Sequence, residues 1–307
     1  MKDGIYKLGK ILLFCSIIIC IVELILRFKL GFCDAVLFEA NDKYEYIAQP
    51  NQTRTRFGVR ICFNTYSQRS AEPDVTKTKI LGLGDSILYG GSMLDQDSIA
   101  TSIFTRETGM QMLNIATGSW GPDNCAAYLR ETGLFDAKAM VLVCSSHDAY
   151  DVMSFTPVVD HYATYPSKQY TCAVCELVER YFIPCVEILW RKAKQKLDPD
   201  EIVLNRVENG DVKKKSFYFN SGFDELKMIA DEAGIPFKIY LHAECKEIQA
   251  GDYNEMGQAI MAWADCTRTE LVSGLQMGET EDMYMDAIHF NEKGQRHLAD
   301  CLKQLFQ

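Results

Sequence analysis

The chain has 307 residues, 48% of them hydrophobic, which is enough to bury a full α/β core. One main domain with an N-terminal appendage is the organisation that this length favours. The formal charge of -10 and the pI near 5.1 argue against nucleic acid as a partner, because the phosphate backbone requires a basic face.

An apolar stretch over residues 11–26 lies close to the N-terminus. The basic residues that flank it are Lys7, Lys10, Arg27 and Lys29. The stretch is slightly shorter than the roughly 20 residues that span a bilayer, and Glu23 interrupts it. No cleavage site of small residues follows promptly, so we expect an uncleaved transmembrane helix over residues 1–30 rather than a signal peptide or a soluble core helix. The small excess of basic charge before the helix predicts a single-pass protein with a cytoplasmic N-terminus and an extracytoplasmic main domain.

Residues 31–78 are too irregular for long helices. We interpret them as a neck that packs the main domain close to the membrane. Residues 59–63 within the neck predict a short strand or an edge hairpin.

From residue 79 onward, apolar strand patterns alternate with helical patterns. Strands are predicted over residues 79–85, 111–116, 139–145, 235–242 and 271–277. Helices are predicted over residues 98–108, 123–132, 223–233 and 291–305. This alternation is typical of a parallel sheet with helices on both faces, so the main domain, residues 79–307, is predicted to be α/β.

The alternation lapses near residues 151–215. Residues 151–170 are loop-like and aromatic, and residues 174–197 show a long helical pattern that Pro184 could break. Insertions that follow strand ends in α/β proteins lie over the site at the carboxyl edge of the sheet. We therefore expect this insertion to form a cap.

The chain contains twelve cysteines, of which Cys15 and Cys20 fall inside the predicted span. The other ten permit disulfides, although a chain of this size does not need them as a framework. Cys172 and Cys175 have a spacing that also occurs in zinc and redox sites, but no second pair of this kind accompanies them. We expect buried thiols with one or two disulfides at most, and no metal site.

A serine, a histidine and an aspartate stand where a catalytic triad would need them. Ser86 follows a predicted buried strand on a glycine-rich turn, and Asp286 and His289 lie three residues apart before the last predicted helix. A serine hydroxyl becomes a nucleophile when a base takes its proton and a third group orients that base. The alternative is that Ser86 is an ordinary turn residue, Asp286 caps a helix and His289 lies on the surface.

Four short blocks in this order resemble the SGNH/GDSL hydrolase superfamily, from Lys79 to the C-terminus. The blocks are Gly84-Asp85-Ser86, the segment from Asn114 to Gly121, Ser146-His147-Asp148, and the segment from Asp286 to His289. The resemblance implies a three-layer α/β/α, flavodoxin-like parallel sheet with strand order 2-1-3-4-5. It also implies a serine-dependent acyl-ester hydrolase that uses Ser86, His289 and Asp286 and requires no cofactor.

The resemblance further implies an oxyanion hole made of three donors. In the family these are the backbone N–H of the nucleophile, here Ser86, a backbone N–H of the second block and an asparagine side chain of the third. Ser119 stands where the second block usually has glycine, and Gly118 is the neighbouring candidate. His147 stands in place of the asparagine, so an imidazole N–H would be the third donor. The alternative is that His147 only orders the loop of Asp148.

The substrate is expected to be an acylated carbohydrate, because membrane-anchored SGNH domains with similar necks are associated with bacterial surface polysaccharides. Trp120 is the aromatic residue that we expect to contact a sugar ring, and Asp148 is expected to be a further contact. The expected function is O-acetyl ester hydrolysis on an envelope or exported glycan, with envelope polysaccharide-modification proteins as possible partners. The alternatives are O-acyl transfer with the same triad and a catalytically silent membrane-anchored interaction protein.

Overall fold

The computed structural model describes residues 2–197 and 214–306. Its centre is a five-stranded parallel sheet in the order β11-β10-β7-β5-β6. The strands are β5 (Lys79–Gly84), β6 (Gln111–Ala116), β7 (Ala139–Ser145), β10 (Phe237–His242) and β11 (Glu270–Ser273). Counted along the chain, this order is the predicted 2-1-3-4-5, so the predicted α/β fold is confirmed.

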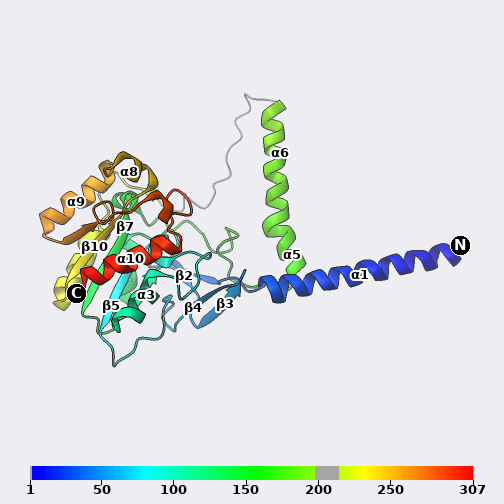
Figure 1. Cartoon of the computed structure of the whole chain (residues 1–307), viewed down its shortest axis with the longest axis horizontal. Coiled ribbons are helices and arrows are strands. Elements are labelled where there is room, and N and C mark those ends of the chain that lie inside the picture. The colour runs from blue at the N-terminus through cyan, green and yellow to red at the C-terminus, as the bar shows by residue number, and fades with distance from the viewer. Residues whose placement is uncertain (1, 198–213, 307) are drawn as a thin grey trace.

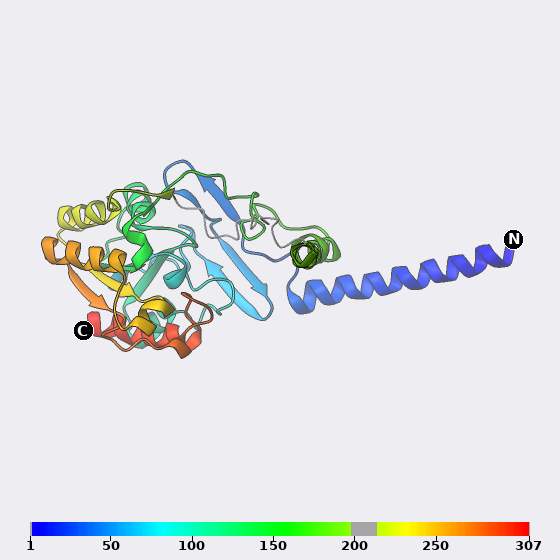
Figure 2. The ribbon, with the colours of Figure 1, turned by 90° about the horizontal axis from the view of Figure 1, so that it is seen from above.

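Helices cover both faces of the sheet (Figures 1 and 2). On one face α3 (Ala100–Thr108) packs against α10 (Glu292–Leu305), and on the other α4 (Pro122–Thr132) packs against α7 (Gly222–Ala233). The central strands are buried throughout because both of their faces meet helices.

Two helices between β10 and β11 were not expected from the sequence pattern. They are α8 (Cys245–Ala250) and α9 (Glu255–Thr267). Gly257, Ile260 and Ala264 of α9 are buried, and Met256, Met261 and Trp263 pack partly buried against the core.

The neck forms two antiparallel hairpins rather than one. Their strands are β1 (Phe38–Asn41) with β2 (Glu45–Ala48), and β3 (Gln52–Arg56) with β4 (Val59–Phe63). Tyr46 and Phe63 belong to the same apolar core as the central strands. The neck is therefore packed on the sheet domain.

The N-terminal helix α1 (Lys2–Leu30) extends away from the sheet domain (Figure 1), and its part Tyr6–Leu30 is long and apolar enough to cross a membrane. Within the insertion, residues 173–197 form one helical rod. It consists of α5 (Ala173–Leu177), a π-helical turn η2 (Val178–Phe182) and α6 (Ile183–Leu197). The helix continues through Pro184, and the π-helical turn ends just before the proline.

The position of this helical rod corrects the cap prediction in part. α5 packs against the end of α1, and α6 stands beside α1 instead of covering the carboxyl edge of the sheet (Figure 1). The loop before α5 stays on the domain, where a two-residue strand β8 (Asp151–Val152) pairs with β9 (Lys214–Lys215). The residues of the insertion from 198 to 213 lie outside the described part of the chain.

All twelve cysteines lie among the described residues, and all are free thiols. The Sγ atom of Cys172 accepts the backbone N–H of Cys175 and caps the first turn of α5. The spacing of this pair therefore has a structural explanation in the start of a helix.

Candidate active site

Ser86 begins a one-turn helix, α2 (Ser86–Tyr89), directly after β5. The Asp85 carboxylate caps that turn by accepting the backbone N–H of Ile87 at 2.8 Å. Gly84 is required at the strand end, because a Cβ atom there would lie 2.7 Å from the carbonyl oxygen of Val143. Since Ser86 is the first residue of the helix, its backbone N–H has no intrahelical acceptor and remains available to a ligand.

The triad residues form a continuous hydrogen-bonded chain. The Oγ atom of Ser86 lies 3.0 Å from Nε2 of His289, and Nδ1 of His289 lies 2.8 Å from Oδ2 of Asp286. The other carboxylate oxygen of Asp286 accepts the backbone N–H groups of Ile288 and His289. Burial alone would raise the pKa of Asp286, but these N–H groups and the His289 ring hold it below its ordinary value. The structure thus brings the three predicted residues together in the order that a nucleophile, a base and an orienting carboxylate would require.

A second histidine lies behind the loop that carries Asp286 and His289. Nε2 of His242 donates to the carbonyl oxygen of Ile288 at 2.8 Å, and Nδ1 lies 3.1 Å from the Glu279 carboxylate. Both partners are acceptors, so the ring must carry both protons. Burial would lower the pKa of His242, but the Glu279 charge raises it above its ordinary value. A buried ion pair therefore supports the catalytic loop.

The Glu279 carboxylate has further donors on the same side of the sheet. It accepts the hydroxyl groups of Tyr240 and Tyr284 and the backbone N–H of Ala243. These bonds satisfy a carboxylate that is almost completely buried. These bonds fix the position of Glu279. Because Glu279 binds His242, and His242 binds Ile288, they also help to fix the loop that carries Asp286 and His289.

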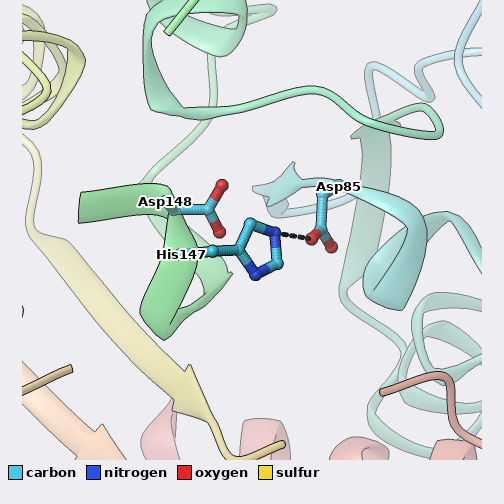
Figure 3. Close-up of side chains that lie close together, drawn as sticks. All are labelled: Asp85, His147 and Asp148. Carbon is cyan, nitrogen blue, oxygen red and sulfur yellow. Dashed lines mark ion pairs between the residues drawn. The ribbon is translucent and has the colours of Figure 1, made fainter. Parts of the chain in front are cut away.

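His147 lies at the carboxyl end of β7 in the short helix η1 (Ser146–Ala149), between three acidic side chains. Nδ1 of His147 lies 3.2 Å from the Glu244 carboxylate, and Nε2 lies 4.0 Å from Oδ2 of Asp85. Figure 3 shows the ring pointing toward Asp85, with Asp148 on the other side. Burial would lower the pKa of His147, but the charge of Asp148, the bond to Glu244 and the charge of Asp85 together raise it to about 10. The ring is therefore an imidazolium at neutral pH.

This protonation leaves one ring N–H for a ligand. Nδ1 of His147 donates to Glu244, whereas Nε2 has no acceptor within hydrogen-bond distance among the residues that the structure describes. An N–H of this kind, near the nucleophile's own turn, suits an oxyanion. The geometry is compatible with the predicted donor role and assigns to Glu244 the task of orienting the ring.

Ligand atoms of Asp85, His147 and Asp148 lie within 4.8 Å of one another, a spacing that a metal ion could bridge. One oxygen of each carboxylate accepts a backbone N–H, that of Ile87 for Asp85 and that of Ser145 for Asp148, and Nδ1 of His147 is bonded to Glu244. We interpret the cluster as a structural group in which one imidazolium faces two buried carboxylates.

The second block lies in the loop after β6, next to β5 in the sheet. Ser119 adopts the left-handed conformation with φ +58°, which explains why glycine is common at this position. The carbonyl oxygen of Gly118 accepts the hydroxyl of Tyr46 at 2.7 Å and that of Tyr165 at 3.4 Å. Side chains from the neck and from the insertion thus fix the loop that carries the second predicted oxyanion donor.

Two predicted substrate contacts are wrong. Trp120 is 2% exposed, donates from its indole N–H to the carbonyl oxygen of Tyr46 and packs against other aromatic rings, so it is a core residue. Asp148 is also 2% exposed, and its carboxylate accepts the backbone N–H of Ser145. Both residues stabilise loops next to the triad, because their polar groups are already satisfied inside the protein.

Several residues that shape the site lie outside the four sequence blocks. Arg69 is completely buried and donates to the carbonyl oxygens of Tyr89, Gly91 and Leu94 in the loop that follows Ser86. His242 is the last residue of β10 and Glu244 follows it, at the same edge of the sheet as Ser86. The only sequence signal for these two residues was a polar group at the end of a predicted apolar strand.

No family model and no curated protein matches the chain. Among solved structures, the chain is similar to a lipolytic protein of the G-D-S-L family from Veillonella parvula, with 13% identity over 75% of this chain and 98% of that one and a TM-score of 0.40. A lipase/acylhydrolase from Enterococcus faecalis has 10% identity over 75% and 95% of the two chains and a TM-score of 0.42. Est24, a carbohydrate acetylesterase from Sinorhizobium meliloti, has 13% identity over 75% and 100% and a TM-score of 0.39.

The strand order and the places of the four sequence blocks on the sheet are those that the resemblance implied. The chain thus has the three-layer α/β fold that the resemblance implied, and the Ser86, His289 and Asp286 side chains form one continuous hydrogen-bonded set beside the end of β5.

Proposed function

We propose that the protein is a serine-dependent acyl-ester hydrolase that forms an acyl-enzyme on Ser86. The observation that carries the proposal is the unbroken chain of hydrogen bonds from Ser86 through His289 to Asp286. His289 accepts the hydroxyl proton as Oγ attacks the acyl carbon, and then gives the proton to the departing alcohol. Water, deprotonated by the same ring, hydrolyses the acyl-enzyme and restores the free serine.

The oxyanion of each tetrahedral intermediate is stabilised by donors at the same sheet edge. In this proposal they are the backbone N–H of Ser86, a backbone N–H at Gly118 or Ser119, and Nε2–H of His147. A protonated imidazole donates a charge-assisted bond, which is stronger than the bond of a neutral amide. His147 could thus replace the asparagine of the family with a donor that carries a full positive charge.

An exposed triad favours an acyl group attached to a large polar substrate. The side chains of His289 and Asp286 are 38% and 53% exposed. A long fatty acyl chain would require an apolar tunnel, whereas a short acyl group on a polymer requires only an open approach. We therefore propose O-acetyl groups of an envelope or exported glycan as substrate. Transfer of the acyl group to a sugar hydroxyl by the same triad is the second candidate.

The test compares hydrolysis and transfer. Purified protein is incubated with a small aryl acetate, with acetylated oligosaccharides, and with an aryl acetate plus unmodified oligosaccharide. Hydrolysis that requires Ser86 supports the esterase, and faster formation of acetylated sugar than of free acetate supports the transferase. If neither reaction occurs and a fluorophosphonate does not label Ser86, the protein is a silent binding protein and the enzymatic proposal is wrong.

The proposed location is a membrane, with α1 as a single span and the sheet domain on the extracytoplasmic side. The apolar side chains of α1 are exposed over most of its length, as expected of a helix that faces lipid. Removal of residues 1–30 should abolish transmembrane anchoring and leave the hydrolysis of an aryl acetate intact. Release of the full chain from membranes by high salt would contradict the span, and a topology reporter after Gln307 tests the orientation separately.

A further inference from the structure

The helical rod of the insertion exposes a row of large apolar side chains. Their exposed fractions are 61% for Phe182, 45% for Ile183, 46% for Val186, 61% for Leu189 and 63% for Trp190. The spacing of three and four residues places most of them on one side of the helix. A row of this kind exposed to water would be unfavourable, so the helix is expected to meet an apolar phase or partner.

The start of the helix is fixed to the end of α1 by polar contacts. The Glu23 carboxylate of α1 accepts the backbone N–H groups of Ala173 and Val174 at 2.9 Å each, which caps α5. Arg27 binds Glu23 and donates to the carbonyl oxygen of Thr171 at 2.7 Å. Glu23, the charge that interrupts the apolar stretch of α1, therefore has a defined role at its junction with the insertion.

A second contact fixes the direction of the rod. Glu176 is completely buried and binds Arg56 of the neck at 2.9 Å and Arg180 of the rod at 2.8 Å. It also accepts the backbone N–H of Cys33 at 2.6 Å. A buried carboxylate with three partners at defined positions resists reorientation, so the rod leaves the junction in one direction.

That direction is crosswise to α1. Figure 1 shows α6 standing upright beside the horizontal α1, and Figure 2 shows α6 end-on while α1 again lies lengthwise. The rod starts at the end of α1 that is nearer the sheet domain. If α1 crosses a bilayer, a helix that leaves this end crosswise lies along the membrane surface.

We propose that α6 and the turn before it lie in the interfacial layer of the bilayer, on the side of the sheet domain, with Phe182, Val186 and Leu189 among the acyl chains. The exposed apolar surface of α1 continues to this junction, so both helices meet the same lipid. Aromatic residues such as Phe182 and Trp190 favour the boundary between acyl chains and headgroups.

The protein contains a native reporter for this contact. Of its three tryptophans, Trp120 is buried in the core and Trp263 donates to Asp224 on the sheet domain, whereas Trp190 is on the rod. The full chain is reconstituted in vesicles of phosphatidylcholine and phosphatidylglycerol that carry bromine either near the headgroup end or near the methyl end of the acyl chains. The fluorescence of a Trp190→Phe variant is subtracted to give the signal of Trp190.

We expect strong quenching of the Trp190 signal by bromine near the headgroup and weak quenching by bromine near the methyl end. Val186→Asp should reduce this quenching toward the background of the Trp190→Phe variant, because a carboxylate opposes burial in lipid. Val75→Asp is the matched control, since Val75 is 89% exposed and lies outside the rod. It should leave the quenching unchanged, and all three variants should hydrolyse an aryl acetate in detergent at the wild-type rate.

The interfacial position of α6 relies on α1 being a membrane span. The experiment tests the position of α6 and the span of α1 separately. Vesicles that keep the protein after a high-salt wash but show no bromine quenching of Trp190 would overturn the interfacial position of α6 and leave the span intact. Shielding of Trp190 from aqueous iodide without bromine quenching would indicate a protein partner on this face and would also overturn it. Loss of the protein from the washed vesicles would overturn the span and the interfacial helix together.

Discussion

His242 donates a hydrogen bond from Nε2 to the carbonyl oxygen of Ile288, the residue directly before the triad histidine. The same ring is paired with the buried Glu279 carboxylate, so a charged pair inside the sheet domain positions the backbone of the catalytic loop. The side chains of Asp286 and His289 on this loop are themselves partly exposed. The function of the loop should therefore depend on residues that never contact substrate.

Replacement of His242 by leucine should lower the free energy of unfolding by about 3–5 kcal/mol, because Glu279 is then left buried without its partner. The double variant His242→Leu/Glu279→Gln should recover much of this loss, since no unpaired charge remains and the glutamine side chain can still accept a hydrogen bond from the neighbouring donors. Its kcat should stay low with little change in KM, because Ile288 still lacks its donor. Thermal or denaturant unfolding and steady-state kinetics measure the two effects. A double variant with wild-type kcat would contradict the positioning role.

Removal of the His147 ring should lower the acylation rate while hardly changing substrate binding, because the oxyanion exists only in the transition state. Loss of one such donor costs about 2.7–4 kcal/mol, a hundredfold to a thousandfold in rate. His147→Asn should keep much of the activity by restoring an amide donor, and His147→Ala should not. Equal damage in both variants together with a lower thermal midpoint would show a purely structural role.

The raised pKa of His147 predicts how stability depends on pH. Between its ordinary value near 6.5 and the native value of about 10, the native protein holds a proton that the unfolded chain has released. The stabilising contribution is complete below about pH 6.5 and is lost as pH rises through about 10. Burial raises the pKa of Asp148 to about 7. The contribution of this group to the free energy of unfolding therefore also falls as pH rises, but at lower pH than that of His147. The free energy of unfolding, measured with denaturant, should therefore decline above pH 7, and His147→Asn should make this decline smaller. The same pH dependence in both proteins would contradict the raised pKa of His147.

Gly118→Ala should disturb the second block, because the added Cβ atom would lie 2.8 Å from the Tyr165 hydroxyl. We expect a lower kcat with modest change in stability. Tyr165→Phe removes the hydroxyl and should restore activity in the Gly118→Ala/Tyr165→Phe double variant, because the next ring atom is 3.8 Å away. Kinetics of the two single variants and the double variant test this. Failure of the double variant to recover would mean that the loop tolerates no side chain at Gly118 for another reason.

Much of the sheet could be predicted from sequence because its central strands, β7 above all, are short apolar runs that are buried on both faces. The triad was also predictable, since Ser86 follows such a strand and Asp286 and His289 precede the last helix. The roles of Trp120 and Asp148 were not, because position beside a motif does not show whether a side chain is satisfied inside the protein. Glu244 and Arg69 act across long sequence separations, and local patterns contain no information on such contacts.

The hydrogen bonds between the neck and the catalytic loops have a consequence for how the protein can be divided. Tyr46 binds the loop of Gly118 and Trp120, and Arg69 holds the turn that follows Ser86, so both flanks of the nucleophile are built partly from residues that precede β5. A fragment that starts at residue 79 would carry every catalytic side chain and yet expose the core of its own active site. The neck and the sheet therefore form one cooperative unit. In a chimera of two related proteins, the boundary would have to lie before residue 38, at the junction with α1, to keep this unit intact.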